Sequence, residues 1–116
     1  MPHSVSIKTL EKFLEIAPWR KIVKKAENAE KGTRIWPTDR NKDDKLNFRV
    51  DKGALVGEKY QLILRANKNA EDKSVRKAAQ EDSHQILATG FVDPKNDAER
   101  KSAIKGIRMD FLRNRK

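Results

Sequence analysis

The side chains best suited to chemistry in this sequence are two arginines, Arg49 and Arg65, each within a run of alternating apolar and polar residues. A planar guanidinium forms charge-assisted and often bidentate hydrogen bonds with phosphate oxygens. Successive side chains of a strand point to opposite faces, so Arg65 lies on the face opposite Tyr60 and Leu62. The spacing therefore predicts that both arginines point away from the core, where they can contact a phosphate backbone.

Groups that transfer protons near neutral pH are scarce in the sequence. His84 begins a strand-like run and is one candidate, although a strand-edge histidine bonded to backbone or water is the simpler interpretation. His3 lies in an N-terminal segment that we expect to be frayed. The sequence has no cysteine, no phosphate-binding glycine loop, no nucleophile elbow and no metal-binding histidine spacing. It therefore predicts neither a metal nor a cofactor.

Charge is the most informative bulk property of the chain. Lys and Arg total 27 against 17 acidic residues, giving a net charge of +10 over 116 residues. Such a balance favours a polyanionic partner, with a merely solubilising surface as the alternative. Segment 18–36 carries six basic residues against two acidic ones, and segment 96–116 carries seven against three. The candidate phosphate-binding residues in these segments are Lys21, Lys24, Lys25, Arg34, Arg100, Lys105, Arg108 and Arg113.

Two aromatic residues have polar edges that suit stacking on a nucleobase. Trp36 and Tyr60 are amphipathic, and aromatic stacking is a sequence-tolerant way to hold single-stranded nucleic acid. Packing in the core is the alternative for both, because large aromatic side chains dominate protein cores.

The periodicity of apolar residues predicts the elements that position these side chains. Helical spacing indicates helices over 6–17 and 19–31, with Pro18 ending the first and opening the second. Alternation indicates strands near 33–36, 46–50, 60–66 and 84–92, and an apolar stripe indicates a C-terminal helix from about Asp97. The connection 67–83 is long enough to be either a mobile loop or a small helix, and with Val75 as its only sizeable apolar side chain we expect it to be the most mobile internal segment.

These elements predict a single α+β domain over 1–116. Its small antiparallel sheet has three to four strands, and two N-terminal helices and the C-terminal helix cover one face of the sheet. No apolar run is long enough to cross a bilayer, and residues 1–6 are too short and polar for a signal peptide. We therefore expect a cytoplasmic protein with no membrane partner.

Three stretches carry a family resemblance: "VSIKTLEKFLE", "LNFRVDKGALVGEKYQLILRANKN" and "SHQILATGFVDPKNDAERKSAI". In the order of their elements they resemble the RelE/HigB-like toxins of bacterial toxin–antitoxin pairs. The resemblance implies metal-independent cleavage of mRNA on the ribosome, with Arg49, Tyr60 and Arg65 as the equivalent residues and His84 or Lys95 nearby. Of these, Arg65, Tyr60 and His84 are the candidate catalytic residues. The chain departs from the family pattern after its last strand, where Val92–Asp93 replaces a His or Lys, and in its longer excursion 67–83.

Cleavage of this kind would begin with a 2′-hydroxyl attacking the adjacent phosphate. A general base takes the hydroxyl proton, and arginines stabilise the charge that gathers on the phosphate oxygens. Arginine itself stays protonated and cannot serve as the base. His84, a carboxylate and a lysine of lowered pKa all remain open for that role.

Three functional hypotheses follow from these observations. The first is a basic RNA-binding protein of the RelE/HigB-like endoribonuclease toxin type, with RNA or the ribosome and an acidic antitoxin-like protein as partners. The second is a non-catalytic nucleic-acid- or ribosome-binding accessory protein of a phage or mobile element. The third is a protein-interaction domain with an acidic partner.

Overall fold

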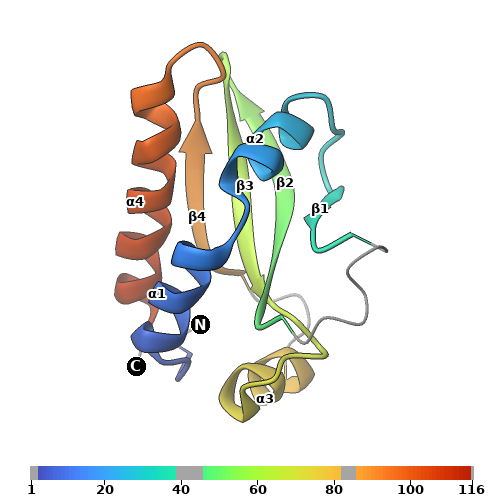
Figure 1. The fold of residues 1–116 in the computed structure, drawn as a ribbon, viewed down its shortest axis with the longest axis vertical. Coiled ribbons are helices and arrows are strands. Elements are labelled where there is room, and N and C mark those ends of the chain that lie inside the picture. The colour runs from blue at the N-terminus through green and yellow to red at the C-terminus, as the bar shows by residue number, and fades with distance from the viewer. Residues whose placement is uncertain (1–2, 39–45, 82–85, 116) are drawn as a thin grey trace.

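Each strand of the sheet pairs with the next strand along the chain. The computed structural model describes residues 3–38, 46–81 and 86–115. In this part the strands β1 (Arg34–Trp36), β2 (Phe48–Val56), β3 (Lys59–Ala66) and β4 (Ile86–Val92) form one antiparallel sheet in that order. The described helices are α1 (Ile7–Ile16), α2 (Trp19–Glu27), α3 (Lys73–Glu81) and α4 (Asp97–Asn114) (Figure 1). The predicted α+β class is confirmed, with α3 added to the three expected helices.

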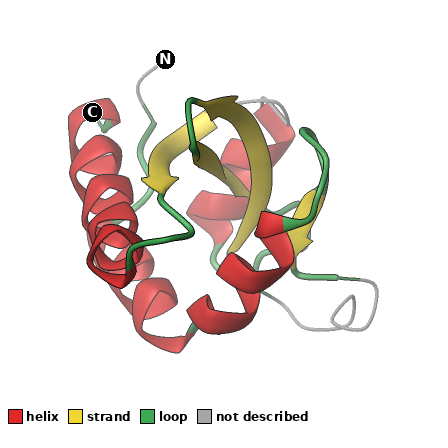
Figure 2. Ribbon diagram, turned by 90° about the horizontal axis from the view of Figure 1, so that it is seen from above, coloured by secondary structure: helices red, strands yellow, loops and turns green. Residues whose placement is uncertain are grey.

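The core lies between one face of the sheet and the helices. Alternation along β2 and β3 buries Val50, Leu62 and Leu64, which are at most 1% exposed. Helix α1 begins where the Ser6 side chain accepts a hydrogen bond from the Lys8 N–H, which caps a free backbone donor. Figure 2 shows the helices gathered against one side of the curved sheet. The other face of the sheet therefore remains open over much of its area.

Helix α3 fills the long connection between β3 and β4 and is anchored at its first turn. The Asp72 carboxylate accepts hydrogen bonds from the Ser74 N–H at 2.8 Å and from the Thr9 hydroxyl of α1 at 2.9 Å. The hydroxyl of Ser74 also donates to it, and these bonds lower the pKa of Asp72. Val75 is fully buried against the core. Of the two alternatives for this connection, the small helix is therefore the one observed.

Helix α4 lies along β4 and approaches it closely. A Cβ atom on Gly90 of β4 would overlap the Ala103 carbonyl of α4 and come within 2.8 Å of Ile107 Cγ1. The free edge of β4 is also occupied, because the Asp110 carboxylate accepts from the Thr89 N–H at 2.8 Å. Asn114 donates to the Leu87 carbonyl at 3.3 Å. Glycine at position 90 is thus needed for helix-to-strand contact, not for an unusual backbone angle.

The N-terminal segment, expected to be frayed, is instead packed from His3 onward. The His3 N–H donates to the Asn114 carbonyl at 3.1 Å, and the imidazole lies 4.5 Å from the Phe111 ring. Its Nδ1 accepts from the Val5 N–H. Only 3% of His3 is exposed. Burial, with Arg115 close by, lowers the pKa of His3 below its ordinary value of 6.5.

Replacing Gly90 by alanine should destabilise the fold, whereas the same change at Gly106 should not. Gly90→Ala must push α4 off β4, an overpacking cost of about 1–3 kcal/mol in the free energy of unfolding. A Cβ on Gly106 meets only the Gly90 Cα at 3.9 Å, so Gly106→Ala should gain about 0.5–1 kcal/mol of helix propensity. Urea unfolding of both variants checks this, and equal effects would contradict the close contact.

The buried His3 should make stability depend on pH in the near-neutral range. Because its folded pKa is lowered, the unfolded chain binds the proton more readily, so stability is fully present above about pH 6.5 and is lost as the pH falls below it. His3→Phe should flatten this dependence. Urea unfolding between neutral and mildly acidic pH measures the slope. A slope unchanged in His3→Phe would refute this assignment.

Candidate functional site

The two arginines on strands β2 and β3 form a cluster around a buried carboxylate. Arg49 and Arg65 are directly opposite each other across the β2–β3 ladder, and Asp51 lies two residues from Arg49 on the same face. Arg49 donates to Asp51 through Nε at 3.1 Å and Nη2 at 3.1 Å, and Arg65 Nε donates at 3.0 Å. The Asp51 side chain is only 8% exposed, against 31% and 20% for the arginines.

This cluster ties two strands together on the sheet face away from the helices. Each guanidinium already has an anionic partner, so the cluster carries less free positive charge than two isolated arginines would. Arg34 of β1 is the cross-strand neighbour of Asp51 and is exposed. The pattern Arg49-x-Asp51 was the available sign of this cluster, since residues two apart share a strand face. That Arg49 and Arg65 contact phosphate stays a prediction.

Tyr60 belongs to the core and not to the surface. It is 2% exposed, and its hydroxyl donates to the Val23 carbonyl of α2 at 2.9 Å. The neighbouring Lys52 is also buried, with Nζ donating to the Ala26 carbonyl and lying 4.5 Å from the centre of the Tyr60 ring. These two side chains hold α2 to the sheet. Neither base stacking nor proton transfer is open to Tyr60 in this position.

Of the remaining predicted catalytic and stacking residues, only some can be placed in the described part of the chain. His84 lies outside the described residues. Trp36 is half-buried, with its ring 5.5 Å from that of Phe13. Within the part of the chain that the structure describes, no group of His, Asp or Glu side chains is arranged to hold a metal ion.

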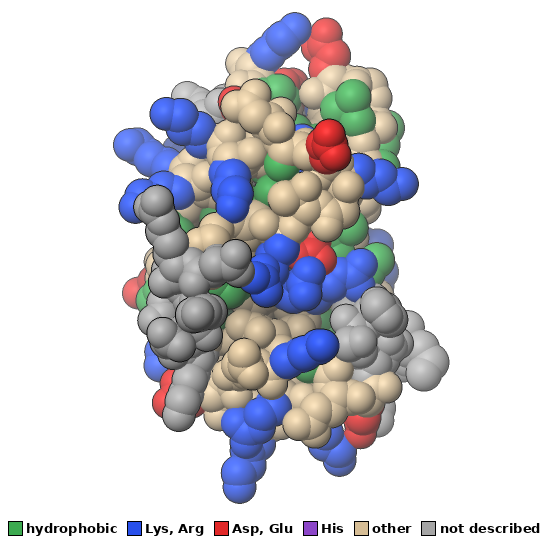
Figure 3. All heavy atoms as spheres, turned by 90° about the vertical axis from the view of Figure 1, so that its right-hand side faces the viewer, with side chains coloured by type: hydrophobic (Ala, Val, Ile, Leu, Met, Phe, Trp, Pro, Cys, Tyr) green, Lys and Arg blue, Asp and Glu red, His purple; other side chains and the backbone are tan. Residues whose placement is uncertain are grey.

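Helix α2 presents a group of exposed cations. Arg20, Lys21, Lys24 and Lys25 are all exposed, because Ile22, Val23 and Ala26 turn the apolar stripe of the helix inward. Figure 3 shows Lys and Arg side chains spread over the face of the molecule that lies on the right-hand side of Figure 1. Among the residues that the structure describes, none of these four cations forms an ion pair.

Among the α4 cations whose side chains are described, two lie beside carboxylates and two form no ion pair. Arg108 is engaged with α1, because its Nε and Nη2 donate to the two carboxylate oxygens of Glu11 at 2.7 and 3.0 Å. Arg113 is exposed and lies 3.8 Å from Asp110. Lys101 and Lys105 are exposed, with no ion pair within the described residues. Arg100 is in α4, but its side chain lies outside the described part of the chain.

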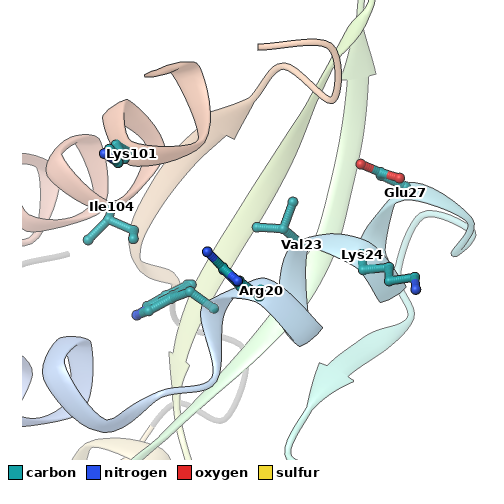
Figure 4. A pocket seen from close by; sticks show the side chains of 7 residues that line it. Arg20, Val23, Lys24, Glu27, Lys101 and Ile104 are labelled. Carbon is teal, nitrogen blue, oxygen red and sulfur yellow. The ribbon is translucent and has the colours of Figure 1, made fainter. Parts of the chain in front are cut away.

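A groove separates α2 from the first half of α4. It encloses about 730 Å³. In Figure 4, Arg20 reaches from α2 toward Ile104 of α4. The groove is lined by Trp19, Arg20, Val23, Lys24, Glu27, Lys101 and Ile104. Trp19 and Arg20 were absent from the predicted site, although their position directly after Pro18 at the start of a basic helix was visible in the sequence.

Comparison with protein families tests the family resemblance. A family model described as "HrmA: Subtelomeric hrmA-associated cluster protein" matches residues 4–110. The chain belongs to the HrmA family. The match takes in the described elements from α1 to β4 and most of α4. No curated protein and no solved structure matches the chain.

Membership of the HrmA family shows that the resemblance to RelE/HigB-like toxins was wrong. The resemblance rested on short strand motifs such as "YQLI" and on the order of elements. Alternating apolar residues and a pair of amphipathic helices arise wherever helices cover one face of an antiparallel sheet, so neither feature is specific. The catalytic roles implied for Arg65, Tyr60 and His84 lose their basis with it. In the described part of this HrmA-family chain, no helix is long and apolar enough to cross a membrane.

Replacing the buried carboxylate of the arginine cluster should cost stability. Asp51→Asn leaves two partly buried guanidinium groups facing an amide that adds N–H donors, so the free energy of unfolding should fall by about 1–3 kcal/mol. The matched control is Glu58→Gln in the same hairpin, whose partner Lys95 is at 3.3 Å with both side chains 74% exposed. Its effect should be small because exposed ion pairs contribute little. Thermal unfolding that shows equal losses would contradict a structural role for Asp51.

Proposed function

We propose that this HrmA-family domain binds nucleic acid without catalysis, through the basic surface formed by α2 and the facing side of α4. The observation that carries the proposal is the set of four exposed cations on α2 that have no ion pair within the described residues. Lys101 and Lys105 of α4 add two more exposed cations.

This choice of surface is supported by which cations already have a carboxylate partner and which do not. A protein that neutralises phosphates releases the counterions condensed on the nucleic acid, and this release drives sequence-independent binding. Arg49, Arg65 and Arg108 would have to exchange an existing carboxylate partner for a phosphate. The exposed α2 cations have no carboxylate partner to give up within the described residues. Binding through α2 therefore requires no rearrangement of the described structure.

The proposal is restricted to binding because two of the groups once assigned to catalysis, Tyr60 and Arg65, have other contacts. The hydroxyl of Tyr60 is hydrogen-bonded to α2 inside the core. Arg65 is held by Asp51. A phosphate-binding surface needs only fixed positive charge, whereas sequence readout needs a groove-entering element. We therefore expect binding with little sequence preference.

Charge reversal on α2 tests the proposal directly. The triple change of Lys21, Lys24 and Lys25 to Glu should weaken binding to oligonucleotides. It should also reduce the slope of log affinity against log salt by about 2, because each phosphate that is no longer neutralised removes about 0.7 from the slope. Fluorescence anisotropy over a salt series measures both quantities.

The matched control changes Lys68, Lys73 and Lys77 to Glu, which alters the net charge equally. These lysines are exposed on and beside α3, at the end of the molecule away from α2 (Figure 1). The control should leave the salt slope close to that of the parent. Equal losses in the two triple variants, or no binding of the parent at low salt, would refute the assignment to α2.

A further inference from the structure

The α2–α4 groove combines features that a uniformly charged helix surface does not have. Trp19 of α2 lines it together with the apolar side chains of Val23 and Ile104. Cations border it on both sides, with Arg20 and Lys24 on α2 and Lys101 on α4. An aromatic ring in a groove with flanking positive charge is the general arrangement that proteins use to hold single-stranded nucleic acid.

The ring of Trp19 is held in place before any ligand arrives. Its indole N–H donates to the Leu14 carbonyl at the end of α1 at 2.8 Å. The ring is also edge-on to Phe13, with a centroid distance of 6.0 Å and an interplanar angle of 83°. A fixed ring loses little conformational entropy when a ligand stacks on it. Trp19 is nevertheless only half-buried, so part of its surface remains available.

The charges around the groove are arranged to leave its Trp19 end positive. Glu27 is the one carboxylate among the lining residues that the structure describes. It is eight residues further along α2, about 12 Å from Trp19 along the helix axis. Figure 4 shows it beyond Lys24, away from Arg20. A phosphate beside Trp19 would therefore meet Arg20 and Lys101 before it met a negative charge.

We propose that this groove receives an unpaired base of a single-stranded nucleic acid, which stacks on Trp19 while Arg20 and Lys101 contact the flanking phosphates. The inference rests on the proposed function and adds the class of nucleic acid. In a duplex the faces of the bases are covered by their neighbours in the stack. A base can reach an aromatic ring recessed between two helices only if it leaves that stack.

Fluorescence of a single-tryptophan variant tests the inference without altering Trp19. The chain contains two tryptophans, so Trp36→Phe leaves Trp19 as the only one. Titration with a short oligothymidylate should quench Trp19 emission and saturate. A blunt duplex of the same length should leave the emission nearly unchanged and bind about tenfold more weakly, the scale of one stacked base.

Two pairs of variants separate stacking from general charge. Trp19→Phe should retain most of the preference for the single strand, and Trp19→Ala should lose about tenfold in single-strand affinity. Lys101→Glu, which changes a residue lining the groove, should weaken single-strand binding more than Lys105→Glu on the next turn of α4. Circular dichroism checks that each variant is folded, and the Trp36→Phe titration decides the question even if Trp19→Ala does not fold.

The outcomes distinguish this inference from the proposed function. Equal affinity for single strand and duplex, with unchanged Trp19 emission and a normal salt dependence, would overturn the groove assignment and leave nucleic-acid binding by α2 intact. Absence of binding to either probe at low salt would overturn both. Preferential binding of the single strand with quenching of Trp19 would support both.

Discussion

The packing of Phe48 is the constraint on which the arrangement of helices depends. Its ring is fully buried on β2 and lies 5.1 Å from Phe13 of α1 and 6.3 Å from Phe111 of α4, in each case nearly edge-to-face. Edge-to-face contacts fix the relative orientation of rings as well as their separation. One strand residue therefore sets the positions of the two helices on either side of it. Because only Ala17 and Pro18 separate α1 from α2, the start of α2 is fixed by the same contact.

The arginines that pair with carboxylates and the lysines of α2 have different roles in this chain. The arginines at 49, 65 and 108 form hydrogen-bonded pairs with carboxylates of other elements or of the same strand. A guanidinium suits this role because its donors form a rigid planar fork. The lysines of α2 have flexible stems and remain in solvent. A count of basic residues does not separate these roles, whereas the partner of each residue does.

The sequence was sufficient to predict the elements and the faces they bury, because the spacing of apolar residues can be read within each element without knowing its distant contacts. The positions of α1, β3 and α4 follow from it, and so does the inward stripe of α2. Contacts between distant residues were not predictable in this way. The pair Arg108–Glu11 joins residues 97 apart in the chain, and the α2–α4 groove depends on the angle between two helices. The burial of helix α3 was underestimated, and its segment was expected to be mobile, because its buried face is mostly alanine, which contributes little apolar area.

The covering of β4 by α4 also limits how copies of this domain can associate. A sheet edge with free N–H and C=O groups can add a strand from another molecule, which leads to strand exchange and polymerisation. Along β4, Asp110 and Asn114 already occupy such groups. The opposite edge is β1, which has only three residues and is followed by Pro37, a residue without an N–H. A basic domain crowded along a polyanion would thus remain a row of separate molecules and would not fuse into a continuous sheet.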